Sequence, residues 1–320
     1  MPNNKKILKI AKSVISTELE AISQLESKLS NSFSEAVQII LKSKGRVIVA
    51  GVGKSANIAN KIVATLNSTG QPSVFLHAAD ALHGDLGNIQ ENDVVICISK
   101  SGNTEELISL IRLIKNLGNK IISICGNKNS FLYNNSDFFI DSTVDKEACP
   151  NNLAPTSSTT AQLVLGDALA VSLLELRNFT DTDFARYHPG GSLGKSMYLK
   201  VSDIISEDSL AKVLVSDSIQ KVIIEISNKR VGATSVFDND KLVGIITDGD
   251  LRRMLEKNTD FISIHASDIM CSNPKTISSD LLAKEALNIM EKNNISQLLV
   301  LDRDNYLGII HIHDILKEGI

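Results

Sequence analysis

The chain has 320 residues, a length that favours two or three domains because a single hydrophobic core seldom grows so large. Apolar residues make up 43% and charged residues 22%, which is typical of a folded globular protein and excludes a disordered or fibrous chain. The formal net charge is −4 and no long basic run occurs, so nucleic acid is not expected as a main partner.

Residues 5–29 carry apolar side chains at helical spacing, with charged side chains between them. This pattern predicts an amphipathic helix and not a signal peptide. No run of about 18 uncharged apolar residues occurs, so no conventional membrane span is expected. The 4 cysteines lie far apart, without the paired spacing of a zinc site or the density of a disulfide scaffold. Reduced thiols and a cytoplasmic location are therefore expected.

Short apolar runs at residues 47–50, 94–99, 121–125 and 138–140 alternate with longer helical patterns. Such alternation predicts an α/β fold, with a parallel sheet covered by helices. The first three runs end in small or hydroxyl residues immediately before a helical segment. These positions are the carboxyl ends of strands, where open α/β sheets bind ligands.

A long apolar helix is predicted to follow residues 155–160 and to end near Leu176. The sequence His-Pro-Gly-Gly at residues 188–191 then interrupts the helical pattern. The first domain is therefore expected to cover residues 1–195.

The remaining residues contain an internal repeat of roughly 60 residues. VSDII at residues 201–205 recurs as ASDIM at residues 266–270. In each copy a segment with helical period, residues 211–228 or 281–293, precedes two short strand runs. Each copy is therefore predicted to have the order β-α-β-β-α and to pair with its twin. The two copies are expected at residues 196–262 and 263–320.

Gly51-Val52-Gly53-Lys54-Ser55 follows the first predicted strand and is similar to two nucleotide-binding motifs. A P-loop requires glycine where Ile48 stands, and a dinucleotide site requires an acid where His77 ends the second strand. Both interpretations therefore fail. The glycines still allow backbone N–H groups to approach an anion at a helix N-terminus, with Lys54 facing it. The alternative is a tight turn with a solvated lysine.

Two clusters of hydroxyl residues open predicted helices, at residues 99–104 and 156–160. Each is suited to cradle a phosphate monoester, and each could instead be an ordinary helix cap. Two such clusters favour phosphate over chance. Because no strong metal-binding pattern accompanies them, a phosphorylated small molecule is favoured over a nucleoside triphosphate with magnesium.

Six motifs taken together resemble those of the D-arabinose 5-phosphate isomerase family. Besides the glycine motif and Ser-x-Ser-Gly-x-Thr, they are HGDLG at 83–87, KEACP at 146–150, APTSSTT at 154–160 and HPGG at 188–191. The resemblance covers nearly the whole chain. It implies a sugar isomerase (SIS) domain, a parallel sheet flanked by helices, followed by a pair of α+β cystathionine-β-synthase (CBS) domains.

The resemblance also implies an activity, the interconversion of D-arabinose 5-phosphate and D-ribulose 5-phosphate through an enediol. This reaction is the first step toward the lipopolysaccharide sugar Kdo. The family requires no cofactor and is a cytoplasmic homotetramer with a phosphorylated pentose as substrate.

Matching motifs imply that Lys54, Glu106, Glu147 and His188 are the catalytic residues. Glu147 is expected to be the carbon base, His188 to assist ring opening or oxygen protonation, and Lys54 to stabilise negative charge. The role of Glu106 is the least defined. Three of them also have a structural alternative, since Glu147 could cap a helix and Glu106 could pair with a helix dipole, while His188 could be a turn residue.

Substrate contacts are expected from the glycine motif, the HGDLG motif and both hydroxyl clusters. The expected residues are Gly53, Ser55, His83, Ser99, Ser101, Thr104, Thr156, Ser157 and Ser158. His77, His83 and Asp85 form the one cluster with metal-like composition. The resemblance implies that zinc can bind at His77 as an inhibitor, whereas core or substrate-contacting histidines are the alternative.

CBS pairs often bind adenosine nucleotides at a Gly-x-x-Thr-x-x-Asp junction. The first copy has Gly244, Thr247 and Asp250 at these positions. The second copy keeps Asp314 but has His311 in place of the threonine. A nucleotide or CMP-Kdo is therefore an expected ligand, and a structural or oligomerising module is the alternative.

Two other functions stay open. One is a non-catalytic sugar-phosphate sensor, although residues 1–45 are too short and insufficiently basic for the DNA-binding domain of such regulators. The other is an isomerase of a different sugar phosphate, because residues 103–105 depart from the usual family pattern inside the phosphate cluster.

Overall fold

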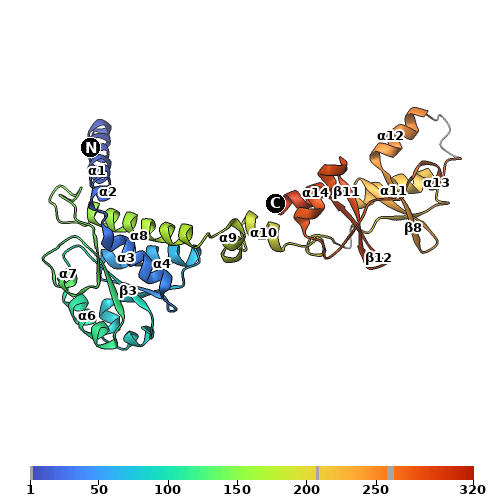
Figure 1. The fold of residues 1–320 in the computed structure, drawn as a ribbon. Coiled ribbons are helices and arrows are strands. Elements are labelled where there is room, and N and C mark those ends of the chain that lie inside the picture. Colours follow the sequence, from blue (N-terminus) through green and yellow to red (C-terminus); the bar gives the residue numbers. More distant parts are fainter. Residues whose placement is uncertain (1–2, 207–208, 258–262) are drawn as a thin grey trace. The chain divides into compact units, whose positions relative to one another are not determined.

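The computed structural model describes residues 3–206, 209–257 and 263–320. The chain forms two compact units, and the division falls between Tyr187 and His188 (Figure 1). The sequence places the domain limit at residue 195, after the HPGG motif, which begins the second unit.

The first unit contains a five-stranded parallel sheet with the order β2-β1-β3-β4-β5. The strands are β1 (Val47–Gly51), β2 (Ser73–His77), β3 (Val94–Ser99), β4 (Lys120–Cys125) and β5 (Phe138–Asp141). The predicted parallel sheet is therefore confirmed. The strand order reverses between β1 and β3, so the connections from these two strands leave the sheet in opposite directions. This is the switch point at which open α/β sheets bind ligands.

Helices cover both faces of this sheet, which explains why β1 and β3 read as continuous apolar runs. One face packs against α3 (Asn31–Lys42), α4 (Lys54–Ser68) and α8 (Ser157–Leu176). The other packs against α5 (Ala78–Ala81), α6 (Glu105–Leu117) and α7 (Phe131–Asn135), with the short η1 (Asp85–Asn88) beside them. The unit ends with α9 (Asp181–Tyr187).

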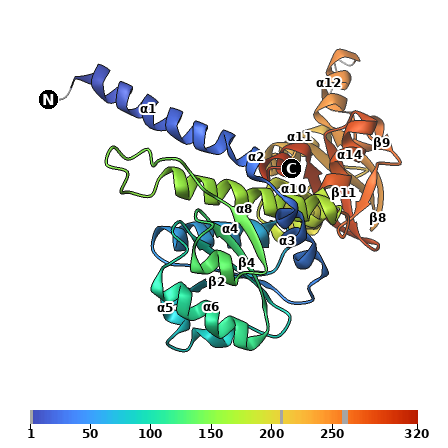
Figure 2. The same cartoon turned by 60° about the vertical axis from the view of Figure 1, so that its left-hand side comes forward.

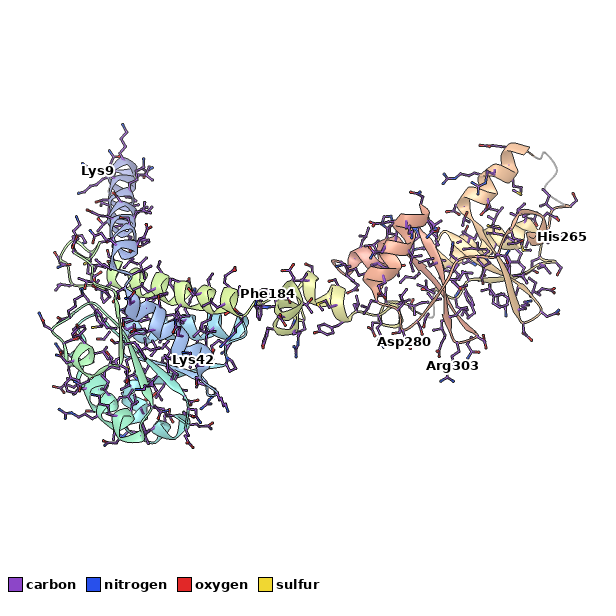
Figure 3. The ribbon with its side chains drawn as sticks, in the orientation of Figure 1. Lys9, Lys42, Phe184, His265, Asp280 and Arg303 are labelled. Carbon is purple, nitrogen blue, oxygen red and sulfur yellow. The ribbon has the colours of Figure 1, made fainter. Side chains whose placement is uncertain are left out.

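The predicted N-terminal helix is present as α1 (Asn4–Ser23), followed by the short α2 (Leu25–Lys28). Helix α1 runs past one end of α8 and extends away from the sheet (Figure 2). Lys9 projects from α1 into solvent (Figure 3). The apolar stripe of α1 is also largely exposed.

Helix α8 is the one helix of the described chain with the length and hydropathy of a membrane span. It packs against α4 and α1, and residues such as Leu165, Leu169 and Leu173 are buried in the core of the sheet unit. Its apolar composition is therefore explained by core packing.

The second unit contains the two repeats, preceded by α10 (Ser192–Tyr198) and η2 (Val201–Asp203). The first repeat consists of β6 (Lys212–Leu214), α11 (Ile219–Lys229), β7 (Ala233–Asp238), β8 (Lys241–Thr247) and α12 (Asp248–Lys257). The second consists of β10 (Thr276–Ser278), α14 (Ala283–Asn293), β11 (Gln297–Asp302), β12 (Asn305–His311) and α15 (Ile312–Lys317). Between them lie α13 (Ala266–Ile269) and β9 (Cys271–Ser272), which pairs with β8.

The predicted order β-α-β-β-α is confirmed in both copies, and a shared apolar cluster joins them. The cluster consists of Ala211, Val231, Ala233, Leu299 and Ile309. One boundary is wrong, because the helix expected from residue 211 begins only at Ile219. The Asp217 carboxylate accepts a hydrogen bond from the Leu214 N–H at 2.7 Å and closes a turn there.

Candidate active site

A cavity of about 270 Å³ lies at the carboxyl ends of β1 and β3, at the switch point of the sheet. Loops after these strands and the start of α8 line it. The lining residues are Val52, Lys54, Ser55, Ile98, Ser99, Lys100, Ser101, Thr104, Leu107, Pro155, Ser158 and Thr159. Lys54 and Lys100 are the charged residues of this described lining, which contains no acid. Lysines among hydroxyl groups suit an anion, although the chain as a whole has a net charge of −4.

The glycine motif forms the turn from β1 into α4. Gly53 has φ +58°, a left-handed conformation that glycine adopts without strain, and it caps α4. Lys54 is the first residue of the helix, whose first turn carries no acid. The Ser55 hydroxyl donates to the side-chain oxygen Oε1 of Gln162 at 3.2 Å, so α8 fixes this side chain. The turn therefore presents a lysine and a hydroxyl group at a helix N-terminus, as the motif predicts.

The loop after β3 folds into a nest. Ser99 Oγ accepts a hydrogen bond from the Gly102 N–H at 2.9 Å, and Ser101 Oγ accepts one from the Asn103 N–H at 3.3 Å. Gly102 has φ +67°, and a Cβ at this position would lie 2.3 Å from the hydroxyl oxygen of Ser130. Glycine is therefore required here by both its conformation and the close approach of the next loop.

Glu147 is buried, and its carboxylate caps α8. Oε2 accepts hydrogen bonds from the backbone N–H groups of Thr156 at 2.8 Å and Ser158 at 3.1 Å, and from the Thr156 hydroxyl at 3.1 Å. Oε1 accepts one from the Ser158 hydroxyl at 2.6 Å. These contacts are those of the helix-cap alternative, while the role of carbon base stays a prediction.

Lys100 completes the surroundings of Glu147, with Nζ 2.6 Å from Oε1. The Glu147 side chain is 0% exposed and that of Lys100 is 45% exposed. Burial raises the pKa of Glu147, but the hydrogen bonds from Lys100, Ser158 and the N–H groups of Thr156 and Ser158 outweigh burial and lower it to about 2. The carboxylate is therefore firmly ionised at neutral pH.

Other predicted site residues lie outside the cavity lining. Ser157 is buried, and its hydroxyl has no hydrogen-bond partner among the described residues. Glu106 lies half-buried in the first turn of α6, and within the described chain its side chain makes no hydrogen bond or ion pair. His83 is exposed between α5 and η1. His188 belongs to the second unit, where its carbonyl oxygen accepts from the Gly191 N–H at 3.2 Å.

The histidine at the end of β2 has few polar contacts. His77 Nδ1 is buried, has no hydrogen-bond partner in the described chain and lies 3.8 Å from Asp80 Oδ2. Within residues 3–206, 209–257 and 263–320, no three side chains of histidine, cysteine, aspartate or glutamate gather in a group that could hold a metal ion. Zinc at His77 would therefore need ligands from elsewhere.

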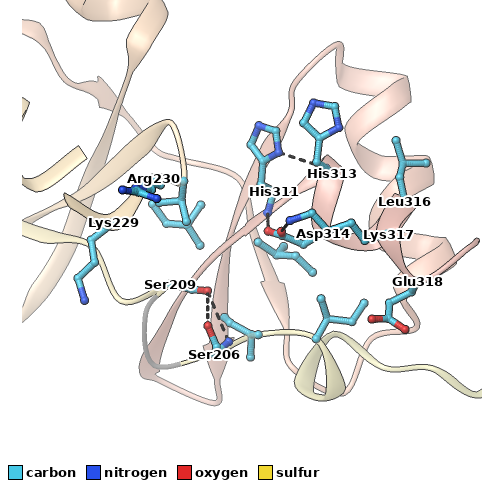
Figure 4. Close-up of a pocket in the computed structure, with 15 residues that line it drawn as sticks. Ser206, Ser209, Lys229, Arg230, His311, His313, Asp314, Leu316, Lys317 and Glu318 are labelled. Carbon is cyan, nitrogen blue, oxygen red and sulfur yellow. Dashed lines mark hydrogen bonds and ion pairs between the residues drawn. The ribbon is translucent and has the colours of Figure 1, made fainter. Parts of the chain in front are cut away.

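Each repeat contributes to a cleft in the second unit. A cleft of about 640 Å³ contains Thr247 and Asp250, and the Thr247 hydroxyl donates to Asp250 Oδ2 at 2.6 Å. A second cleft, of about 900 Å³, contains His311 and Asp314. Lys229 and Arg230 of the first repeat lie across this second cleft from His311 and Asp314 (Figure 4). The repeat junctions thus open into cavities large enough for a nucleotide.

Comparison with known proteins identifies the family. The SIS domain model matches residues 39–172, and the CBS domain model matches residues 201–257 and 266–320. The arabinose 5-phosphate isomerase KdsD of Pseudomonas aeruginosa is 45% identical, and the match covers 100% of this chain and 99% of that protein. The chain belongs to the arabinose 5-phosphate isomerase family. The expected SIS fold and CBS pair are confirmed.

Two further relatives agree with this assignment. The KdsD protein of Francisella tularensis is 47% identical to this member of the isomerase family, over 94% of this chain and 93% of that protein. A solved structure of an Escherichia coli CFT073 protein in complex with arabinose 5-phosphate is 39% identical, with a TM-score of 0.57. It covers 59% of this chain and 100% of the solved chain.

Two polar residues that line the cavity were not among those predicted to contact substrate. Lys100 lies between two serines that the sequence selects, and Thr159 lies one residue beyond Ser158. The only available signal was their position inside the two hydroxyl clusters.

Proposed function

We propose that the protein interconverts D-arabinose 5-phosphate and D-ribulose 5-phosphate, the first step toward Kdo for lipopolysaccharide. Full-length similarity to arabinose 5-phosphate isomerases supports this activity. The carrying structural observation is the cavity at the switch point, which gathers Lys54, Lys100 and the hydroxyl groups of the nest. These groups suit a phosphate monoester, because ammonium and hydroxyl groups donate hydrogen bonds to phosphate oxygens.

The reaction moves one proton through an enediol. A base takes the proton from C2 of the open-chain aldose, the C–H electron pair forms the C1–C2 double bond, and the oxygen at C1 gains a proton. Return of a proton to C1 and loss of the C2 hydroxyl proton give the ketose. In this scheme Glu147 is the base, Lys54 stabilises the oxyanion, and His188 transfers protons to oxygen or assists ring opening. Glu106 supplies the remaining carboxylate.

Isomerisation assays with purified protein and no added metal test the activity. Arabinose 5-phosphate, ribose 5-phosphate, glucose 6-phosphate and sedoheptulose 7-phosphate are offered separately and followed by proton NMR in D₂O. Conversion of arabinose 5-phosphate alone, with deuterium entering at the carbon beside the carbonyl, is expected. Turnover of another sugar phosphate instead would identify that sugar phosphate as the substrate. Binding without any turnover would favour a sensor.

We further propose a cytoplasmic homotetramer, as the family resemblance implies. The exposed apolar side chains of α1, including Ile7, Leu8, Ile15 and Leu19, support burial against another copy. Sedimentation equilibrium measures the mass. The Leu8→Glu, Leu19→Glu double variant is expected to lower it, and an unchanged tetramer would exclude α1 from the interface.

We propose that the first CBS cleft binds an adenosine nucleotide or CMP-Kdo. The Thr247 hydroxyl and Asp250 carboxylate lie in this cleft and offer hydrogen bonds to a ribose. His311 replaces the threonine in the other cleft, so binding there is expected to be weaker or absent. Calorimetry with AMP, ATP and CMP-Kdo decides, and the absence of heat from all three would favour a structural module.

We propose that catalysis requires no cofactor and that zinc at His77 inhibits. The enediol scheme moves protons only, and general acid–base groups of the chain suffice for it. Dialysis against EDTA is therefore expected not to abolish turnover. Loss of turnover that zinc restores would contradict the proposal.

A further inference from the structure

The ammonium group of Lys100 has two competing partners. Its backbone belongs to the nest after β3, and its side chain lines the cavity together with Lys54. Its Nζ nevertheless lies 2.6 Å from the buried Oε1 of Glu147. The side chain is 45% exposed and its four-carbon stem is flexible, so the same ammonium group can reach a ligand in the cavity.

The other contacts of Glu147 are neutral. Helix α8 faces the carboxylate with N–H and hydroxyl groups of Thr156 and Ser158, and none of these carries a charge. The titratable groups that interact with it are Lys100, from the loop after β3, and the Cys149 thiol in its own loop. Farther along α8, the Thr160 hydroxyl donates a hydrogen bond to Glu18 of α1. Lys100 is therefore the cation that balances the Glu147 charge.

We propose that Lys100 is a positioning residue that exchanges partners: it pairs with Glu147 until a phosphoryl group occupies the nest, and then turns to that dianion. The exchange leaves Glu147 capped by neutral donors but without its cation. An unpaired buried carboxylate binds a proton more strongly, so sugar-phosphate binding converts Glu147 from an ion-pair partner into a base. Phosphate recognition and proton abstraction, which occur at opposite ends of the sugar, are thereby coupled.

The coupling rests on the proposed isomerase function, in which Glu147 is the base. Its first test does not need turnover. Sulfate has the charge and shape of a phosphoryl dianion and does not itself titrate above about pH 3. Any proton taken up when sulfate binds is therefore taken up by the protein, and the buffer supplies it. Calorimetry at pH 5 in buffers of different ionisation enthalpy measures this uptake.

Wild-type protein is expected to take up protons when sulfate binds. Lys100→Met and Glu147→Gln are expected to take up none, and Lys100→Arg to keep the uptake because the charge remains. Lys128→Met is the matched control. Lys128 lies in the loop after the neighbouring strand β4, and it forms an ion pair of 2.9 Å with the largely buried Asp141 outside the cavity lining. It is expected to behave as wild type. Failure of sulfate to bind, or equal uptake by Lys100→Met and wild type, would overturn the coupling.

The second test uses turnover of arabinose 5-phosphate. In wild type the acid limb of kcat, which reports the bound enzyme, is expected at least about one pH unit above that of kcat/KM calculated for the substrate dianion, since the phosphate of the free sugar itself titrates at about pH 6. In Lys100→Met the two limbs are expected to coincide, and Lys100→Arg to restore their separation. A separation unchanged in Lys100→Met would refute the coupling. Complete absence of turnover with wild-type proton uptake intact would instead refute the isomerase function alone.

Discussion

Replacing Glu147 with glutamine tests how strongly the α8 cap stabilises the first unit. Glutamine has nearly the shape of a protonated glutamic acid, so Glu147→Gln removes the charge while an amide oxygen stays available to the N–H groups of Thr156 and Ser158. The variant loses the ion pair with Lys100 and places an amide N–H₂ group among donors. Its cost therefore approximates the free energy of protonating the native carboxylate.

The pKa of Glu147 gives the size of this cost. The pKa falls from 4.5 to about 2 on folding, and each unit corresponds to about 1.4 kcal/mol, so the charged form stabilises the fold by about 3 kcal/mol at neutral pH. Because the folded pKa is the lower one, this stabilisation is present above pH 4.5 and is lost as the pH falls toward 2. By pH 4 about 1 kcal/mol of it is already lost.

Scanning calorimetry of the full chain at pH 7 and pH 4 measures the effect on the transition of the first unit. A cost of about 3 kcal/mol corresponds to a decrease in Tm of about 6–12 °C at pH 7, and the decrease is expected to be about 2–4 °C smaller at pH 4. Glu106→Gln is the control, because the Glu106 side chain makes no hydrogen bond or ion pair in the described chain. A decrease in Tm below about 2 °C for Glu147→Gln at pH 7 would refute the reasoning. A decrease for Glu106→Gln as large as that for Glu147→Gln would refute it too.

Two further predictions concern glycines. Gly102→Ala places a Cβ 2.3 Å from Ser130 Oγ at φ +67°, so it is expected to distort the nest and raise KM for the sugar phosphate about tenfold or more with a smaller change in kcat; steady-state kinetics with an unchanged KM would contradict this. Gly166→Ala places a Cβ 2.3 Å from Ile62 Cδ1 between α4 and α8, and the overpacking is expected to cost about 1–3 kcal/mol by calorimetry. Adding Ile62→Val should recover part of this loss, and no recovery would exclude the clash as its cause.

The alternating pattern of the first half predicted its sheet because both faces of a parallel strand are buried. β3 (Val94–Ser99) is buried along its whole length, and such runs are visible without knowledge of the tertiary structure. Boundaries set by single hydrogen bonds were less predictable. Because Asp217 closes a turn, α11 begins only at Ile219, although the apolar spacing upstream is compatible with a helix.

The residues that line the cavity were predictable where they lie beside a strand end. Lys54, Ser99 and Thr104 were selected because their motifs directly follow predicted strands, and the structure brings the ends of these strands, β1 and β3, together at the switch point. The pair of Lys100 and Glu147 was not, because its partners come from loops far apart in sequence and their approach depends on how α8 packs. Local pattern predicts which groups reach the edge of a sheet, whereas contacts between loops require the tertiary structure.

The N-terminus of α8 explains why two hydroxyl clusters need not mean two phosphate sites. Thr156 and Ser158 supply the donors that the second cluster would offer to an anion, and the Glu147 carboxylate already accepts them. A phosphoryl dianion at the same donors would have to displace a buried charge, at a cost of several kcal/mol. By contrast, the described residues that line the cavity beside the nest after β3 include no aspartate or glutamate that would occupy its donors. A single phosphoryl group therefore belongs at the nest, while Lys100 and Ser158 hold the Glu147 carboxylate at the start of α8.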